Sequence, residues 1–488
     1  MTVTRQSFSR VITSRAQTCP DEIVVIGDDG RETLTAAELD LQSNRLARAY
    51  LARGVCRDDL VAVALPNCVE FVVACAAIWK AGATPHPVSP SLRDGERAAL
   101  EQLARPALAV GAPPADPSIP WAPQGFIAAG SAAPLPEVWP ACWKAPTSSG
   151  STGRPKIVKA AAPALIDPDQ PVAIFLPQRA VQLVSAPLWH SAAFTYAFRG
   201  LLTGHQLVLG SVFSEQGFDE HRFGELVQRH AITWTLLSPN QIHRLVRTPR
   251  RFDMGSLESV LHLGAACSPA DKRELIAWLG AEKVIEVYAG SESNGLTMIT
   301  GTEWLSHPGS VGRAVGGTRI QIRRDDGGTA KAGEIGQIWM HRGEQPAYTY
   351  VGGRSQRTDD GWDTLGDLGH LDEDGYLTVV DRSADVIDHA GTAVYPSRVE
   401  HALESHPRVR GAVAYGLPDG RGVAAVVEVD GDSEGHLAGE VTAATLTHFA
   451  RTRLTAAELP CRLDFTRNPL RNSAGKVRRS TFRTPLEV

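Results

Sequence analysis

The sequence predicts an α/β fold, with a large N-terminal domain of α/β-layered subdomains, a β-rich subdomain and a small α+β C-terminal domain. From about residue 22, short β-branched runs alternate with helical stretches, which is the pattern of parallel sheets covered by helices. After about residue 305, glycine and aspartate turns separate short strands, as in antiparallel hairpins. The last segment, residues 382–488, has the size of a small separate domain.

The first half of the chain supplies the alternating elements. Phe8, Val11 and Ile12 lie on one face of a first predicted helix. EIVVIG and DLVAVALP are predicted strands, and residues 36–53 and 68–80 are predicted helices. Residues 113–140 are rich in proline and alanine and indicate an irregular connection. Further strands are predicted at AVQLVSAPL, AITWTLLSP, SLESVLHLG and KVIEVYAG, and ligands of such sheets usually bind at the carboxyl ends of strands.

The second half contains the β-rich subdomain, residues 305–381, and the C-terminal domain. GEIGQIWMHRG and GWDTLGDLGHLDEDGYLTVVDR have the turn spacing of hairpins. We place the domain boundary after Asp381, so that residues 1–381 form the N-terminal domain and residues 382–488 the C-terminal one. The latter has helical patterns at residues 397–405 and 440–453, and strands at RGAVAYGLP and GVAAVVEVD.

The composition points to small-molecule partners. The 488 residues are 43% hydrophobic and 21% charged, with a net charge of −5, which gives no electrostatic footprint for nucleic acid or an anionic membrane. Seven scattered cysteines without CxxC spacing argue against a zinc site or a disulfide framework and for a reducing compartment. The N-terminus lacks an apolar signal-peptide core, and FVVACAAIW is too short to span a bilayer. We therefore expect a cytoplasmic protein.

The stretch TSSGSTGRPK, residues 147–156, predicts an anion-binding loop. Its glycines let backbone N–H groups converge, and its hydroxyl groups add donors. The loop is not a Walker A motif, because Pro155 stands five positions after Gly150 and Ile157 follows Lys156. Taken alone, the loop could equally be a flexible Ser/Gly linker.

Seven stretches in a fixed order identify a family resemblance. They are TSSGSTGRPK (147–156), PLWHSA (187–192), LGAACS (263–268), VYAGSE (287–292), WDTLGD (362–367), DRSADVIDHAGTAVYPSRVE (381–400) and RNSAGKVRR (471–479). In this order they resemble the adenylate-forming (ANL) superfamily, which includes acyl-CoA synthetases, nonribosomal-peptide adenylation domains and firefly luciferase. SGSTGRPKIV is more similar to acyl-CoA ligases. The resemblance implies that ATP, Mg²⁺ and coenzyme A are used, and that the C-terminal domain is mobile.

The resemblance also implies roles for individual residues. Lys476 would reach the carboxylate and the α-phosphate, Glu292 would hold Mg²⁺ on the ATP phosphates, and His190 would line the acyl pocket. Tyr288 would stack on adenine, and Asp367 would accept hydrogen bonds from the ribose beside the cation of Arg382. The other nucleotide contacts implied are Thr147, Ser148, Ser149, Gly150, Ser151, Thr152, Gly153, Lys156, Gly264, Ala265, Ala266, Ala289, Gly290 and Ser291.

The same resemblance implies an acyl pocket, a hinge and a thiol channel. Ala384 would mark the hinge and Gly391 the coenzyme A channel. The pocket residues are Trp189, His190, Phe194, Trp234, Leu263 and Gly290. Their apolar and aromatic character indicates a hydrophobic acid, and an aliphatic, aromatic or terpenoid acid would fit. Each role also has a structural alternative, since a tyrosine ending a strand can be core and acidic groups beside glycine are commonly turn or cap residues.

Several positions depart from the family pattern, among them Asp381, which precedes Arg382 where a glycine is usual. Ala289 replaces the glycine that gives clearance to the nucleotide, Leu365 replaces the threonine of the ribose motif, and Ala384 replaces the usual hinge aspartate or lysine. One hypothesis is therefore that adenylation is impaired and that a second ligase supplies preformed acyl-adenylate. The departures also fit a specialised biosynthetic pathway. Coenzyme A or a carrier protein as the acceptor, and a monomer or a homodimer, are left open.

Two other function classes fit the sequence less well. GDSEG, residues 431–435, matches the GxSxG elbow of a serine hydrolase with Ser433 as nucleophile and His448 as base. The flanking acidic residues oppose formation of an oxyanion, so an acidic hairpin is the better interpretation. A binding protein without catalysis would need neither Glu292 nor Lys476. The expected function is therefore an acyl-CoA ligase acting on a hydrophobic carboxylic acid.

Overall fold

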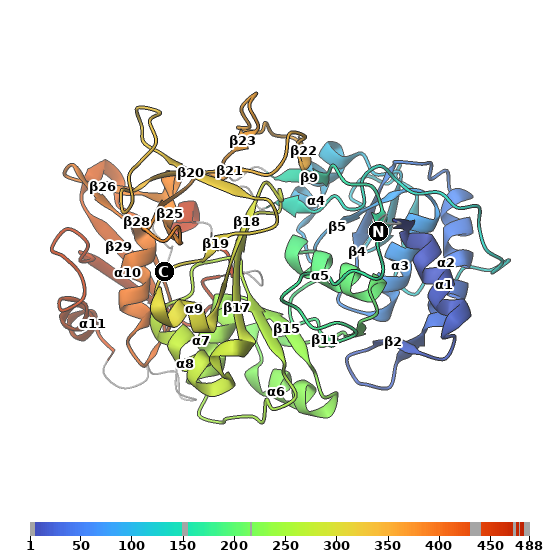
Figure 1. Cartoon of the computed structure of the whole chain (residues 1–488), viewed down its shortest axis with the longest axis horizontal. Coiled ribbons are helices and arrows are strands. Elements are labelled where there is room, and N and C mark those ends of the chain that lie inside the picture. The colour runs from blue at the N-terminus through green and yellow to red at the C-terminus, as the bar shows by residue number, and fades with distance from the viewer. Residues whose placement is uncertain are drawn as a thin grey trace.

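The computed structural model describes residues 5–148, 155–214, 217–429, 441–471, 475–477 and 479–482. The chain forms an elongated molecule in which the first helices and the C-terminal unit lie at opposite ends of the long axis (Figure 1). The predicted α/β architecture is confirmed. Several predicted features lie outside the described residues: Ser149, Gly150, Ser151, Thr152, Gly153 and the GDSEG stretch with Ser433.

A four-stranded parallel sheet and its helices form the N-terminal end. The strands pair in the order β5-β4-β6-β7. Their bounds are β4 (Leu60–Ala64), β5 (Thr84–Pro87), β6 (Leu108–Gly111) and β7 (Trp121–Pro123), and the helices are α1 (Phe8–Thr18), α2 (Ala36–Leu51), α3 (Val69–Lys80) and α4 (Asp94–Ala104). Every residue of α3 except Glu70 is buried, which explains its largely apolar sequence, and the buried Lys80 is paired with Asp40. The face of α1 predicted to be buried is indeed buried.

A nine-stranded sheet occupies the middle of the molecule. Its order is β19-β18-β17-β16-β15-β11-β12-β2-β3, and all pairs from β2 to β17 are parallel. The bounds are β2 (Ile23–Ile26), β3 (Thr33–Thr35), β11 (Val181–Leu183), β12 (Gln206–Val208), β15 (Trp234–Leu237), β16 (Ser259–His262), β17 (Val284–Ala289), β18 (Leu296–Thr300) and β19 (Arg313–Ala314). The carboxyl ends of β11, β15, β16 and β17 therefore meet at one edge.

Helices cover this central sheet. They are α5 (Ser191–Leu202), α6 (Glu220–Arg229), α7 (Pro239–Arg247), α8 (Pro269–Leu279) and α9 (Gly301–Ser306). The Ser238 hydroxyl caps α7 by accepting from the backbone N–H of Gln241, and the Gln241 side chain accepts from the backbone N–H of Ser238. This reciprocal pair is a capping box. The Gln241 side chain also donates to the carbonyl oxygen of Ser185 over 2.7 Å. The end of β11 and the start of α7 are thereby tied together.

The predicted hairpin region forms an antiparallel sheet. Its strands are β20 (Arg319–Arg323), β21 (Gly336–His341), β23 (Trp362–Asp363), β24 (Asp367–Leu371) and β25 (Leu377–Arg382). A second small sheet has the order β22-β9-β8, with β8 (Thr147–Ser148), β9 (Lys156–Ala160) and β22 (Tyr348–Val351). The register places Tyr350 opposite Val158. The predicted anion-binding loop joins β8 to β9, and its β9 end lies beside β22.

The residues after β25 pack around their own apolar core. The elements are β26 (Ile387–His389), β27 (Thr392–Val394), α10 (Pro396–Glu404), β28 (Val409–Gly416), β29 (Val423–Val429), α11 (Ala443–Ala450) and β30 (Arg462–Thr466). Asp381 joins this unit to β25, because its carboxylate accepts from the backbone N–H groups of Arg382 and Ser397. A carboxylate at the start of α10 is stabilised by the helix dipole. The predicted boundary after Asp381 remains a prediction.

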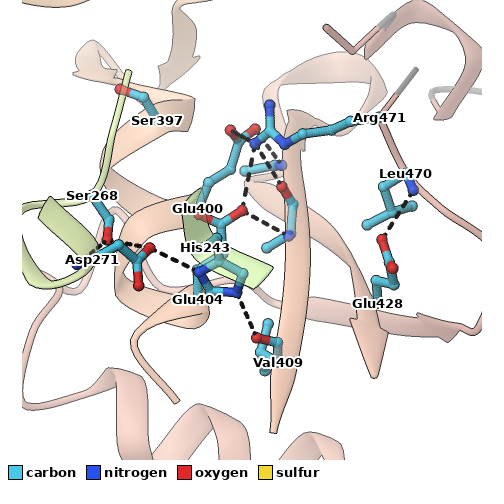
Figure 2. Close-up of polar contacts among 12 residues, drawn as sticks. His243, Ser268, Asp271, Ser397, Glu400, Glu404, Val409, Glu428, Leu470 and Arg471 are labelled. Atoms are coloured by element: carbon cyan, nitrogen blue, oxygen red, sulfur yellow. Dashed lines mark hydrogen bonds and ion pairs between the residues drawn. The ribbon is translucent and has the colours of Figure 1, made fainter. Parts of the chain in front are cut away.

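The C-terminal unit is held against α7 and α8 (Figure 2). His243 Nε2 donates to the carbonyl oxygen of Val409 over 3.1 Å, and Nδ1 lies 2.8 Å from the carboxylate of Asp271. Both ring nitrogens face acceptors, which the protonated imidazolium satisfies. Burial opposes that charge, but the hydrogen bond and the charge of Asp271 outweigh it and raise the pKa of His243. The interface therefore contains a buried histidine whose two ring nitrogens both have hydrogen-bond partners.

Candidate active site

The predicted nucleotide residues converge at the carboxyl edge of the central sheet. Leu263 and Gly264 follow β16, and Tyr288 and Ala289 end the adjacent strand β17. Gly264 has a φ of 101° and is exposed, a conformation that glycine adopts without strain. The loops after these strands include Ala265, Ala266, Gly290 and Ser291. The arrangement matches the usual position of ligands in parallel sheets.

Tyr288, Asp367 and Arg382 form one hydrogen-bonded group. The Tyr288 hydroxyl donates to Asp367 Oδ2 over 2.6 Å, and Arg382 Nε lies 3.3 Å from Asp367 Oδ1. Asp367 and Arg382 are also directly paired across β24 and β25. Burial and the nearby Asp367 carboxylate raise the pKa of Tyr288. The hydroxyl therefore stays protonated and fixes the ring beside the carboxylate predicted to bind ribose.

Glu292 is fixed by a residue that the sequence analysis did not identify. Its side chain is 8% exposed, and its Oε1 accepts a 2.6 Å hydrogen bond from the hydroxyl of Tyr350. The ammonium of Lys156 lies 5.1 Å from the centre of the same Tyr350 ring. Tyr350 therefore connects the end of the anion-binding loop to the predicted metal-holding carboxylate. The only sequence signal for it is the β pattern of YTYV, which carries no catalytic motif.

The residues around Glu292 fit a magnesium ion bound through phosphates. Mg²⁺ in nucleotide sites commonly takes one or two carboxylates and fills its remaining positions with phosphate oxygens and water. Glu292 provides one carboxylate, and its second oxygen, Oε2, is not the acceptor of the Tyr350 bond. Lys156 adds a cation for phosphate next to it. This set can hold the metal together with an ATP molecule.

Lys476 reaches this group from the C-terminal unit. A Cβ atom added at the preceding Gly475 would lie 3.4 Å from the Cβ atom of Ser238, so this segment lies against the end of β15. Burial and then the charge of Arg382 lower the pKa of Lys476, whereas Glu292 and Asp367 act to raise it. The Lys476 ammonium is therefore within electrostatic range of the ribose and metal positions.

His190 lies near Lys476, on the side of the centre that is predicted to bind the acyl group. It is the N-cap residue of α5, and burial followed by the charge of Lys476 lowers its pKa to about 4. The preceding loop is held by Asn67, whose amide donates to the carbonyl oxygen of Ala186 over 2.9 Å and accepts from the N–H of Leu188 over 2.8 Å. The imidazole is thus neutral at pH 7 and fixed close to Lys476. The Trp189 ring is 5.9 Å from the His190 ring.

The wall of the predicted acyl pocket comes from one side of α5. The α5 face, defined as Ser191, Ala192, Thr195, Tyr196 and Arg199, is the side of the helix that is not buried. Its spacing of one, three and four residues is that of one helical surface. Ala192, Tyr196 and the predicted pocket residue Leu263 pack against one apolar cluster.

Two predicted pocket residues do not line an open surface. Phe194 has no exposed surface and packs with Phe71, Trp79 and Phe198 in the N-terminal core. Its helical phase turns it away from the α5 face, so the prediction that it lines the pocket is corrected. Trp234 is also fully buried, and its indole N–H donates to His205. It lies behind Tyr196, with 5.9 Å between ring centres, and supports the wall without forming it.

Lys144 is a second residue that the sequence analysis missed. It is 5% exposed, and its ammonium donates to the hydroxyls of Ser191 over 2.9 Å and Thr195 over 2.6 Å. Burial, and next the charge of Arg199, lower its pKa to about 7. A buried lysine bound to neutral hydroxyls is unusual, because burial of a cation is normally compensated by an anion.

The remaining predicted positions lie at the surface of the site or beyond it. Gly290 is closely approached by Leu365, since a Cβ atom added there would lie 2.5 Å from Leu365 Cδ1. The Ala289 side chain is exposed. Ala384 is exposed in the short 3-10 turn Ser383–Asp385 after β25. Gly391 is exposed in the turn between β26 and β27, with a φ of 80°.

Comparisons with known proteins identify the family of the chain. The model of the family of AMP-binding enzymes matches residues 12–132 and 145–351. A long-chain-fatty-acid–CoA ligase of Mycobacterium tuberculosis is 27% identical and covers 92% of both chains. A 2-succinylbenzoate–CoA ligase of Geobacillus kaustophilus is 28% identical and covers 95% of both.

A solved structure shows the same fold. The o-succinylbenzoate CoA synthetase of Bacillus subtilis, in complex with its acyl-adenylate intermediate, superposes with a TM-score of 0.80, covers 99% of both chains and is 23% identical. In the part of the chain that the structure describes, no helix has the length and apolar character needed to cross a membrane.

Proposed function

The chain belongs to the AMP-binding enzymes of the adenylate-forming superfamily, and from this premise we propose that it is an AMP-forming acid–thiol ligase. It activates a hydrophobic carboxylic acid as an acyl-adenylate and transfers the acyl group to coenzyme A. The observation that carries this proposal is the position of Lys476 within electrostatic range of Glu292, Asp367 and His190. The relatives named above are themselves CoA ligases.

The first half-reaction joins two anions. The acid's carboxylate oxygen attacks the α-phosphorus of ATP, the bond to the β-phosphate oxygen breaks, and pyrophosphate leaves. Lys476 places a positive charge between the carboxylate and the α-phosphate, where repulsion would otherwise oppose the approach. Asp367 and Tyr288 hold the nucleoside, and the bound metal at Glu292 would neutralise the leaving phosphates. The neutral His190 imidazole adds no positive charge beside Lys476.

The second half-reaction needs a different arrangement of the C-terminal unit. The sulfur of coenzyme A attacks the acyl carbon, AMP leaves, and Lys476 is no longer required at the α-phosphate. Ala384 lies in an exposed turn between the two units, which suits a hinge. The hairpin turn at Gly391 would then face the thiol channel. These two roles rest on the family resemblance and are part of the proposal.

The test is a screen of carboxylic acids with ATP, Mg²⁺ and coenzyme A. AMP release and the mass of the thioester are measured for each acid, and ATP–pyrophosphate exchange is measured without coenzyme A. We expect at least one acid with an apolar body to give both exchange and thioester. Exchange without any thioester would point to a different acceptor. Thioester formation only from added acyl-adenylate would instead support the impaired-adenylation hypothesis and a partner ligase in a specialised pathway.

A further inference from the structure

The α5 face carries a guanidinium with no carboxylate beside it. In the described part of the chain, Arg199 takes part in no ion pair, and the charged groups that act on it are Arg342 and Arg5. Its side chain is exposed, yet surrounding protein desolvates it and lowers its pKa, and both neighbouring arginines lower it further. The guanidinium is therefore accessible to a ligand that approaches the α5 face.

Lys144 adds a second cation behind the same face. Its ammonium is bound by Ser191 and Thr195, and its charge and that of Arg199 repel each other. The negative charge of Glu292 acts to raise the pKa of Lys144. Among the described residues, these two side chains form no ion pair. Two cations thus lie along one helical face, and the hydroxyls that contact Lys144 are neutral. Such an arrangement destabilises the free protein unless an anion compensates it.

The wall between the cations and the rest of the pocket is apolar. Ala192, Tyr196 and Leu263 pack against the buried cluster that contains Trp234. The region therefore offers an apolar surface ending in an arginine, rather than a fully apolar pocket. An acid with only one carboxylate would leave Arg199 without an anionic partner on this surface.

We propose that the acid carries a second carboxylate at the end remote from the reacting one, and that Arg199 binds it with the support of Lys144. This inference rests on the proposed function. A guanidinium binds a carboxylate through two parallel hydrogen bonds, which gives both affinity and orientation. The second carboxylate compensates the two cations, while the first is delivered to Lys476 and His190.

The helix sets the length of this acid. His190 and Arg199 are nine residues apart on α5 and its cap, which corresponds to about 13 Å along a helix axis. The arginine side chain shortens that span by several ångströms when it reaches toward the substrate. The two carboxylates are therefore expected on the order of 8–12 Å apart, joined by an apolar chain or ring. Short diacids such as malonate are excluded by this length.

The experiment compares matched pairs of acids. Each pair is a monocarboxylic acid and the dicarboxylic acid of the same skeleton, in aliphatic and aryl series that cover the expected spacing. The wild-type enzyme is expected to show a kcat/KM at least about tenfold higher for the diacid in the best-fitting pair, since paired charges of this kind contribute more than 1.4 kcal/mol. Arg199→Met is expected to remove this preference mainly through KM, and Arg199→Lys to retain part of it.

The control variant is Arg45→Met, which removes an exposed arginine from α2 and is expected to leave the preference unchanged. Thermal unfolding with and without ATP shows that each variant is folded. A wild-type enzyme that uses monoacids as well as or better than every paired diacid would overturn the inference alone. An unchanged preference in Arg199→Met would do the same. Failure of every acid in exchange and in thioester formation would overturn the proposed function as well.

Discussion

Tyr350→Phe is the sharpest single perturbation of the metal-holding group. It removes one oxygen atom and leaves the ring on which the Lys156 ammonium lies at 5.1 Å. The lost contact is a 2.6 Å hydrogen bond to Glu292 Oε1, and Glu292 is only 8% exposed. A hydrogen bond to a buried carboxylate contributes about 1.5–3 kcal/mol. Without it, the carboxylate must reorient or recruit water before it can hold a metal.

The expected effect falls on the first half-reaction. If the loss of this hydrogen bond reduces transition-state stabilisation by about 1.5–3 kcal/mol, kcat/KM for Mg-ATP decreases by about 10- to 150-fold. ATP–pyrophosphate exchange over a range of Mg²⁺ concentrations measures this, and we expect a higher apparent KM for the metal–nucleotide complex. Thioester formation from synthetic acyl-adenylate, which needs no metal on the β- and γ-phosphates, is expected to change much less.

Tyr348→Phe is the matched control. The Tyr348 hydroxyl donates over 2.9 Å to Asp363, which is 1% exposed, so the variant also removes a hydrogen bond to a buried carboxylate. Its loss of stability in denaturant unfolding should resemble that of Tyr350→Phe, whereas its exchange activity should stay closer to wild type. Equal exchange in Tyr350→Phe and wild type, or an equal loss in both variants, would refute the positioning role.

Three further predictions concern other parts of the molecule. Ala289→Gly is expected to raise exchange a few-fold if its methyl group obstructs the nucleotide, and unchanged exchange would exclude that cause. Burial and the charge of Arg199 lower the Lys144 pKa from 10.5 to about 7, so the folded chain binds this proton more weakly than the unfolded chain. Unfolding free energies should therefore rise between about pH 7 and pH 10 by on the order of 4 kcal/mol relative to Lys144→Met, and parallel pH profiles would contradict this. The raised pKa of His243 means that the stability added by its protonated form is fully present below about pH 6.5 and is lost as pH rises through the folded pKa. Hydrogen exchange of β28 amides should accordingly be faster in His243→Ala below that pH, and equal protection would show that the contact does not hold the C-terminal unit.

Helices and strands were predictable from the sequence where a periodic apolar pattern ended at a clear boundary. The helix of residues 36–53 and the strand DLVAVALP are found as α2 and β4 with shifts of a few residues. The helix predicted at residues 440–453 is shorter in the structure, because Thr442 caps it and it ends at Ala450. Propensity alone does not locate such caps, which depend on side-chain hydrogen bonds.

The residues of the site were predictable only where they belong to a recognised sequence motif. Tyr288 and Asp367 were identified by motif order, yet the hydrogen bond between them joins strands of two separate sheets. Tyr350 and Lys144 belong to no motif. They join the site because the fold brings them into contact with distant segments, Tyr350 with Glu292 and Lys144 with Ser191. Phe194 was misplaced because a motif gives proximity to the site without the helical phase. Only the start of α5 at Ser191 decides which side of the helix faces the pocket.

The central claim is that a lysine of the C-terminal unit serves the nucleotide site of the N-terminal one, and Lys476→Ala tests it most directly. The measurement compares ATP–pyrophosphate exchange with thioester formation from synthetic acyl-adenylate and coenzyme A in the same preparation. The account predicts that exchange falls by at least about a hundredfold, as expected when a charge that contacts the reacting groups is removed, while thioester formation stays within a few-fold of wild type. Retained exchange, or an equal loss of both half-reactions in a folded variant, would contradict it.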